Sequence, residues 1–178
     1  GGERFRLSIS EASPVYAAAQ KARLSEFHPD FLGAFETLGE RPFLLVANEW
    51  LDCLPARQFL QGGEGWMERV VGLTDEGDLT FGLATDKVEK LSSEPADGQT
   101  SIEVQPALDT LCETLADAFA RAPGRALLID YGPAGNAPGD TLRAFKDGAQ
   151  VGPLDMPGES DLTVDVDFAR LARLAEKR

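Results

Sequence analysis

Cysteine and histidine are scarce in this chain of 178 residues. With 2 cysteines and 1 histidine, the sequence has no zinc-ligand pattern, and no metal site is expected. Cys53 and Cys112 lack the Cys-x-x-Cys spacing of thiol oxidoreductases, so thiol redox chemistry is the weakest functional hypothesis. Two widely separated thiols favour a reducing compartment over a disulfide-stabilised secreted protein.

Positive charge and long apolar runs are also in short supply. The sequence has 17 Lys and Arg against 30 Asp and Glu, which gives a net charge of −13 at pH 7. This charge repels nucleic-acid phosphates and anionic lipids, so neither partner is expected, whereas a basic protein substrate is compatible with it. No apolar run approaches the roughly 18 residues of a membrane-spanning helix, so membrane insertion is not expected. Hydrophobic content of 43% and charged content of 26% fit one globular domain.

The most informative stretch covers residues 43–59, FLLVANEWLDCLPARQF. Its apolar start, residues 43–47, has the length of a strand, and the chain then becomes polar at Asn48 and Glu49. Asp52 follows three residues after Glu49, so one turn of helix would place both carboxylates on one face. Because ligands of open α/β sheets bind at the carboxyl ends of the strands, this pattern indicates a site. The alternative is a plain turn, in which Asp52 accepts bonds from backbone amides and Glu49 is solvated.

The same stretch resembles the signature of the MidA-like methyltransferases, which use S-adenosylmethionine. Their pattern is an apolar strand followed by Asn-Glu-aromatic-x-Asp-x-x-Pro-x-Arg-Gln-Phe. The matching residues here are Asn48, Glu49, Trp50, Asp52, Pro55, Arg57, Gln58 and Phe59. Later stretches that also match are ALLIDYG (126–132) with GDTLRAF (139–145), and PGESDLTVDVDF (157–168). The family includes mitochondrial members that methylate an arginine of a respiratory complex I subunit.

The resemblance implies an α/β protein with a partial class I, Rossmann-like methyltransferase fold and an inserted antiparallel β-meander. It also implies S-adenosylmethionine as the cofactor, a protein arginine side chain as the methyl acceptor, and a protein partner such as a complex I subunit. The expected location is the cytoplasm of a bacterium or the mitochondrial matrix of a eukaryote. The alternative function is a non-catalytic assembly or interaction module derived from a methyltransferase, with Trp50 and the meander as its partner surface.

The resemblance implies roles for individual residues. Glu49 and Asp52 are expected to be catalytic, because carboxylates hold a guanidinium by paired hydrogen bonds and help to remove its proton. Asn48 is expected to orient the substrate or the amino-acid end of the cofactor. Residues 5–11 alternate as a strand ending in Glu11, ahead of a helix, and an acid at that position usually accepts hydrogen bonds from a ribose. A solvated strand end is the alternative for this acid.

Four further residues are expected on the substrate side of the site: Tyr131, Asp130, Glu103 and Asp161. Asp130 and Tyr131 end a predicted strand, where Tyr131 either contacts the substrate or is a rim aromatic. Glu103 matches a family glutamate ahead of a helix, and the alternative is a first-turn acid stabilised by the helix dipole. Asp161 matches a family position near the substrate, as does Asp167.

We predict a single partial domain over residues 1–178. Residues 1–55 and 103–132 form Rossmann-like βα units, residues 56–84 form the meander, and residues 133–178 form a substrate-side hairpin, strand and helix. The predicted strands are 5–11, a short remnant at 27–28, 43–47, 56–61, 66–73, 79–84, 125–131 and 162–166. The predicted helices are 14–24, 103–122 and 168–177, with a loop at 85–100 and a hairpin at 139–151 that turns at Asp147 and Gly148.

Two features of the family are missing from this sequence. Its glycine-rich cofactor turn, Glu-x-Gly-x-Gly-x-Gly, does not occur, and Asp165 stands where the family commonly has histidine. We therefore expect the chain to be a fragment of a longer protein. Without the family's first strand, the two strands that flank it have unpaired edges. Residues 43–47 and 126–129 are still expected to be adjacent parallel strands buried on both faces, because both are continuous apolar runs.

Overall fold

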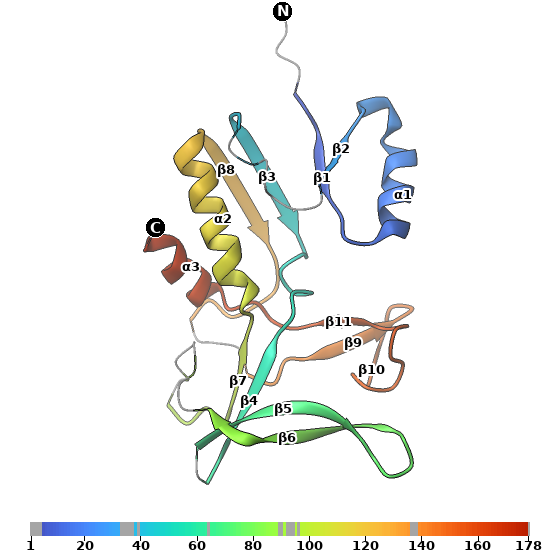
Figure 1. Cartoon of the computed structure of the whole chain (residues 1–178), viewed down its shortest axis with the longest axis vertical. Helices are drawn as coiled ribbons and strands as arrows, with labels where there is room; N and C mark the ends of the chain where they lie inside the picture. Colours follow the sequence, from blue (N-terminus) through green and yellow to red (C-terminus); the bar gives the residue numbers. More distant parts are fainter. Residues whose placement is uncertain are drawn as a thin grey trace, which may run out of the picture.

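The computed structural model describes residues 5–32, 38, 40–63, 65–88, 91, 95, 97–135 and 139–177. The elements before the meander are β1 (Ser8–Ser10), α1 (Pro14–Arg23), the 3₁₀ turn η1 (Ser25–Phe27), β2 (Asp30–Leu32) and β3 (Phe43–Asn48). There follow β4 (Arg57–Gly62), β5 (Gly65–Leu73), β6 (Leu79–Val88), β7 (Ser101–Val104), α2 (Ala107–Arg121) and β8 (Gly124–Ile129). The last elements are β9 (Arg143–Lys146), β10 (Ala149–Val151), β11 (Asp161–Thr163) and α3 (Phe168–Glu176). Figure 1 shows their arrangement, which confirms the predicted α/β class.

The strands β3 and β8 form a parallel pair in which Asn48, the last residue of β3, lies opposite Ile129, the last of β8. The predicted parallel neighbours are therefore confirmed. The predicted burial on both faces is wrong, because Leu44 is 76% exposed and Val46 is 66% exposed. Leu45, which points to the opposite face, packs against the core. Within the described residues this two-stranded sheet is thus covered on one face only.

The main hydrophobic core lies between this pair of strands and the helices α2 and α3. Leu108, Leu111 and Leu115 recur at helical spacing along α2 and are buried. They cluster with Leu51 and Val166, and side chains from β3, β8 and α3 pack around them. Figure 1 shows α2 beside β8, with α3 next to it. Because Leu51 follows β3 and Val166 precedes α3, the core also fixes the chain just beyond the end of β3 and the segment that leads into α3.

The inserted sheet has the strand order β6-β5-β4-β7, and all its neighbouring strands are antiparallel. The predicted meander β4-β5-β6 is confirmed, but β7 lies where the sequence predicts a loop over residues 85–100 and a helix over residues 103–122. That boundary is wrong: Glu103 lies in β7, opposite Gln58 of β4. The strand is held by a second core in which Phe59, Ile102 and Val104 are buried together. Burial against β4, rather than local propensity, decides the conformation of this segment.

The amino-terminal group pairs β1 with β2 in parallel and adds α1. Ser13 caps α1 with its side chain and Pro14 occupies the first turn, which confirms the predicted helix. The predicted strand remnant at residues 27–28 is wrong, because His28 has a φ of 46° and ends the turn η1. The strand β2 begins at Asp30 instead. Within the described residues, β1-β2 and β3-β8 are separate two-stranded sheets.

The carboxyl-terminal segment carries a three-stranded sheet of order β10-β9-β11, followed by α3. The predicted hairpin of β9 and β10 is confirmed, with φ values of 50° at Asp147 and 78° at Gly148 in its turn. Asp167 caps α3, as predicted, by accepting the backbone N–H of Arg170 at 2.7 Å. The strand β11 is shorter than predicted and ends at Thr163. Among the described helices, none has the length and apolar character needed to cross a membrane.

Candidate functional site

The site is built on the turn that follows β3. The chain leaves the strand at Glu49, whose φ of 45° lies in the left-handed region and whose backbone N–H donates to the carbonyl of Ile129 at 2.8 Å. A non-glycine residue reaches this region at a cost of roughly 1–3 kcal/mol, and such residues cluster at functional sites. The predicted helical turn from Glu49 to Asp52 is wrong, since these residues form an irregular turn.

Contacts from three directions fix this turn. The side chain of Leu51 is 1% exposed and packs into the main core. The carbonyl of Leu51 accepts a hydrogen bond from Nε2 of the buried Gln105 at 2.6 Å, and the carbonyl of Asp52 accepts one from the backbone N–H of Val164 at 3.0 Å. Sequence reasoning missed Gln105, although a polar residue directly before Pro106 and the apolar face of α2 was a usable signal.

A further set of contacts to this turn comes from Asp130, directly after β8. Its Oδ2 accepts the backbone N–H groups of Trp50, Leu51 and Asp52 at 3.0, 2.7 and 3.2 Å, and its Oδ1 accepts the N–H of Tyr131 at 2.9 Å. Main-chain donors therefore occupy both oxygens of this carboxylate. For Asp130 this geometry favours a role in binding backbone amides over the predicted substrate contact. Asp52 also accepts a backbone hydrogen bond, from Cys53.

Glu49 and Tyr131 meet at the exposed rim of the site. The hydroxyl of Tyr131 donates a hydrogen bond to Oε1 of Glu49 at 3.0 Å. This bond is the main reason why the pKa of the Tyr131 hydroxyl is raised. The contact joins the end of β8 to the turn after β3 and holds the Glu49 carboxylate near the strand ends. Asn48 is also exposed there, at the end of β3.

Asp52 is partly buried, and its electrostatic surroundings are acidic. Burial is the largest cause of its raised pKa, followed by the charges of Asp130, Asp161 and Glu49. The structure thus brings three other predicted site acids within electrostatic range of Asp52. Across the described part of the chain, no group of three or more His, Cys, Asp or Glu side chains is arranged to hold a metal ion.

Glu103 lies away from this rim, inside the inserted sheet. It is 2% exposed, and its Oε1 accepts hydrogen bonds from Gln58 Nε2, the backbone N–H of Thr141 and the backbone N–H of Leu142 at 2.7, 3.0 and 3.1 Å. Its Oε2 contacts the Thr141 hydroxyl. Burial raises the pKa of Glu103 despite these bonds. The arrangement favours a structural role, which attaches the chain before β9 to β7, over the predicted substrate contact.

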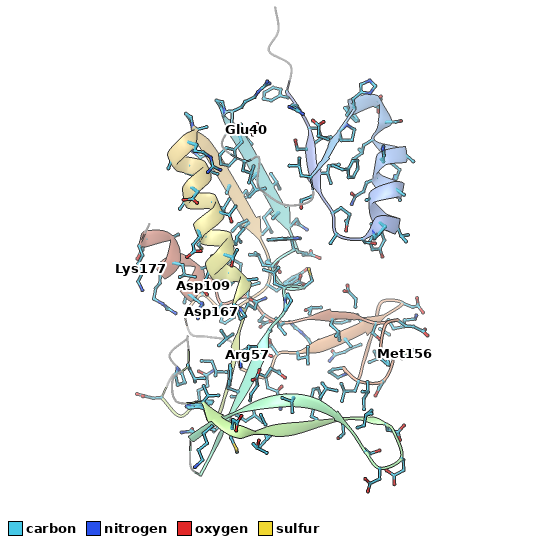
Figure 2. The ribbon with its side chains drawn as sticks, in the orientation of Figure 1. Glu40, Arg57, Asp109, Met156, Asp167 and Lys177 are labelled. Atoms are coloured by element: carbon cyan, nitrogen blue, oxygen red, sulfur yellow. The ribbon has the colours of Figure 1, made fainter. Side chains whose placement is uncertain are left out.

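Three other acids from the sequence motifs are held by their own neighbourhoods. Glu11 accepts the N–H of Ser13 at 2.8 Å and Gln20 Nε2 at 3.0 Å, so it organises the turn between β1 and α1. Asp165 forms an ion pair with Arg143. Asp167 is buried at the start of α3, near Asp109 of α2 (Figure 2). These three acids therefore do not contribute to the rim at the ends of β3 and β8, where Glu49 and Asp52 lie.

Comparison with known proteins gives a match over residues 2–178 to the family model described as "Putative S-adenosyl-L-methionine-dependent methyltransferase". The chain is 35% identical over 141 residues to the mitochondrial protein arginine methyltransferase NDUFAF7 homolog of Caenorhabditis elegans. It is 34% identical over 140 residues to the human mitochondrial protein arginine methyltransferase NDUFAF7. These alignments cover 76% and 74% of this chain but only 33% and 30% of the relatives, so the chain spans about a third of their length.

Two crystal structures from Burkholderia thailandensis have the same fold. This chain superposes on each of them with a TM-score of 0.75 and 25% sequence identity. The superposition covers 97% of this chain, and 50% of one solved chain and 48% of the other. One of the two was solved with S-adenosyl-homocysteine bound. These likenesses confirm the predicted Rossmann-like methyltransferase fold. Since the family model covers nearly every residue, the chain belongs to this family of S-adenosyl-L-methionine-dependent methyltransferases.

Proposed function

We propose that the whole protein uses S-adenosylmethionine to methylate an arginine side chain of a protein substrate. The observation that carries this proposal is the placement of Glu49 and Asp52 on one fixed turn at the carboxyl ends of β3 and β8. Family membership supports the cofactor, and relatives named as protein arginine methyltransferases support the acceptor. A respiratory complex I subunit as substrate, and the mitochondrial matrix or bacterial cytoplasm as location, belong to the same proposal.

The acid pair suits a guanidinium substrate. Two carboxylates accept its N–H groups in pairs and offset its positive charge. When bound, S-adenosylmethionine supplies a methyl group on a sulfonium. A guanidinium nitrogen of the substrate attacks that methyl carbon in line, the sulfur–carbon bond breaks, and the nitrogen gives up a proton. Asp52 accepts this proton more readily than an ordinary aspartate, because burial and the Asp130 charge raise its pKa. The hydrogen bond from the Tyr131 hydroxyl orients the Glu49 carboxylate, which pairs with the guanidinium of the substrate.

Asn48 and Glu11 are our proposed cofactor contacts. Asn48 is the exposed last residue of β3, and its amide offers a donor and an acceptor to the amino-acid end of the cofactor. Each oxygen of Glu11 accepts one hydrogen bond within the chain, which leaves lone pairs for ribose hydroxyls. The residues present therefore fit both ends of the cofactor, although the sequence has no glycine-rich turn that would let the backbone approach it.

Glu49→Gln and Asp52→Asn in the whole protein test the proposal. An amide keeps the shape of the side chain but neither balances a guanidinium charge nor takes its proton. Each variant is expected to lower kcat by roughly 10²–10⁴-fold, while the melting temperature and the cofactor affinity stay close to wild type.

The matched control is Asp155→Asn, since Asp155 lies in the turn after β10, accepts the backbone N–H of Gly152, and is not among the charges that raise the pKa of Asp52. This control is expected to keep full turnover. If the two site variants melt early yet turn over normally per folded molecule, the acids only form the turn.

An assembly or interaction module is a second candidate. One face of the β5-β6 hairpin is apolar, with Val71 opposite Phe81 and Leu73 opposite Leu79, and all of these side chains are exposed. Contiguous exposed apolar side chains are typical of partner surfaces. Calorimetry of the whole protein with S-adenosylmethionine separates the two candidates, because binding favours the enzyme and its absence favours the module.

A further inference from the structure

We propose that Asp130 is a positioning residue, which sets the geometry of the Glu49 and Asp52 carboxylates from the end of the neighbouring strand. This inference rests on the proposed function of the two acids. It starts from an arrangement that the sequence does not reveal: a carboxylate after β8 binds the backbone of a turn after β3, 78–80 residues away in the chain. The carboxylate acts on the acids through the main chain rather than on the substrate.

The geometry around Asp130 is that of a backbone anion nest. Three consecutive N–H groups, those of Trp50, Leu51 and Asp52, converge on its Oδ2 at 2.7–3.2 Å. The preceding residue, Glu49, has a left-handed φ of 45°. Such convergence is stabilised by an acceptor oxygen, because three amides aimed at one point repel one another when it is empty. Asp130 therefore stabilises the backbone conformation from which Glu49 and Asp52 project.

The remaining contacts of the turn do not replace this one. Gln105 and Val164 donate to the carbonyls of Leu51 and Asp52, so they fix the accepting groups of the turn. Asp130 accepts hydrogen bonds from the N–H groups of Trp50, Leu51 and Asp52, so it fixes the donating groups of the turn. Without it the three N–H groups lose their acceptor, which destabilises the left-handed conformation at the start of the turn. A shift of about 1 Å in a catalytic group can cost roughly 10²-fold in rate.

Asp130 also contributes charge to the surroundings of Asp52. The titratable groups that face Asp52 are Glu49 and Cys53 on the turn, Asp130 and Tyr131 after β8, and Asp161 on β11. Among their charges, that of Asp130 has the largest effect in raising the pKa of Asp52. Removing this charge while keeping a hydrogen-bond acceptor therefore lowers the pKa of Asp52 and leaves the turn in place.

Two substitutions at Asp130 in the whole protein separate these effects. Asp130→Asn retains an oxygen that accepts the three amides and loses only the bond from the Tyr131 N–H, so most of the turnover is expected to remain. The acidic limb of its kcat/KM profile is expected to move to lower pH, because Asp52 then titrates lower. Asp130→Ala removes the acceptor, and kcat is expected to fall about 10²-fold with cofactor affinity retained. Asp155→Ala, which removes a carboxylate from the backbone N–H of Gly152, is the control and is expected to change neither parameter.

Hydrogen exchange of the same proteins provides a readout that does not depend on activity. The amides of Trp50, Leu51 and Asp52 are expected to exchange faster in Asp130→Ala, and at close to the wild-type rate in Asp130→Asn. If these amides exchange at the wild-type rate in Asp130→Ala, the positioning role is overturned, whether or not the turnover changes. Faster exchange in a protein whose wild type methylates no arginine would instead count against the proposed function. Equal turnover and equal pH profiles in all Asp130 variants would also overturn the inference.

Discussion

The acidic side chains of this protein differ in how many hydrogen bonds their carboxylates accept from the protein itself. Glu49 and Asp52 project from the turn after β3, whereas hydrogen-bond donors of the protein itself saturate Asp130 and Glu103. The sequence motifs identified all four as site residues, because a motif gives the position of a carboxylate but not its direction. Contacts between distant residues, such as that of Glu103 with Thr141, decide the direction and lie beyond local patterns.

Glu103→Gln is predicted to fold as well as wild type, whereas Glu103→Ala is predicted to lose at least about 2 kcal/mol of stability. Glutamine keeps the oxygen that accepts from Gln58, Thr141 and Leu142, and its amide can donate to the Thr141 hydroxyl. Alanine leaves these donors buried without an acceptor. Denaturant unfolding of both variants measures the difference, and a loss as large in the glutamine variant would contradict it.

The same pair of variants predicts a dependence on pH. Burial raises the pKa of Glu103, so the ionised form is less favourable in the folded than in the unfolded chain. Wild-type stability from this group is therefore complete below the unfolded-state pKa and is lost as the pH rises through the raised folded-state pKa. Glu103→Gln lacks this loss and should gain stability relative to wild type across that window. A relative loss with rising pH would show that the protein stabilises the anion.

Among the elements, those with local signals were predictable. Ser13 and Pro14 mark the start of α1, and Asp147 with Gly148 marks the β9-β10 turn. The strand β7 was missed because its alternation is short and leads directly into the apolar face of α2, so only its pairing with β4 identifies it. The exposed face of β3 and β8 was missed for a similar reason, since a continuous apolar run does not tell which face α2 covers.

Gly132→Ala is predicted to destabilise the junction between β8 and the segment before α3. A Cβ at Gly132 would lie 2.1 Å from the carbonyl oxygen of Val166, which is backbone and cannot rotate away. The N–H of Val166 donates to Tyr131 at 2.8 Å, so this segment would have to shift as a unit. We expect a loss of roughly 1–3 kcal/mol in the free energy of unfolding.

Gly135→Ala is the matched control, because a Cβ there meets nothing within 4 Å. It is expected to leave the unfolding free energy unchanged. Equal stability of the two variants would show that the contact between residue 132 and Val166 relaxes without cost.

At the scale of the whole molecule, the chain carries the two residues that we propose as cofactor contacts. It places Glu11 after β1 and Asn48 at the end of β3, but the sequence has no glycine-rich turn. We therefore predict that the 178-residue chain by itself binds S-adenosylmethionine weakly or not at all, and that the whole protein binds it. Calorimetry on both measures this, and tight binding by the chain alone would contradict the prediction.

The central claim is that the acids at the carboxyl end of β3 hold an arginine for methyl transfer, and one measurement tests it most directly. The whole protein is incubated with isotopically labelled S-adenosylmethionine and two peptides that differ only in carrying arginine or lysine. Mass spectrometry then locates the label. The predicted result is a labelled methyl group on the arginine peptide alone, which disappears with Asp52→Asn. Label on lysine, or no transfer to either peptide by a protein that binds the cofactor, would contradict the account.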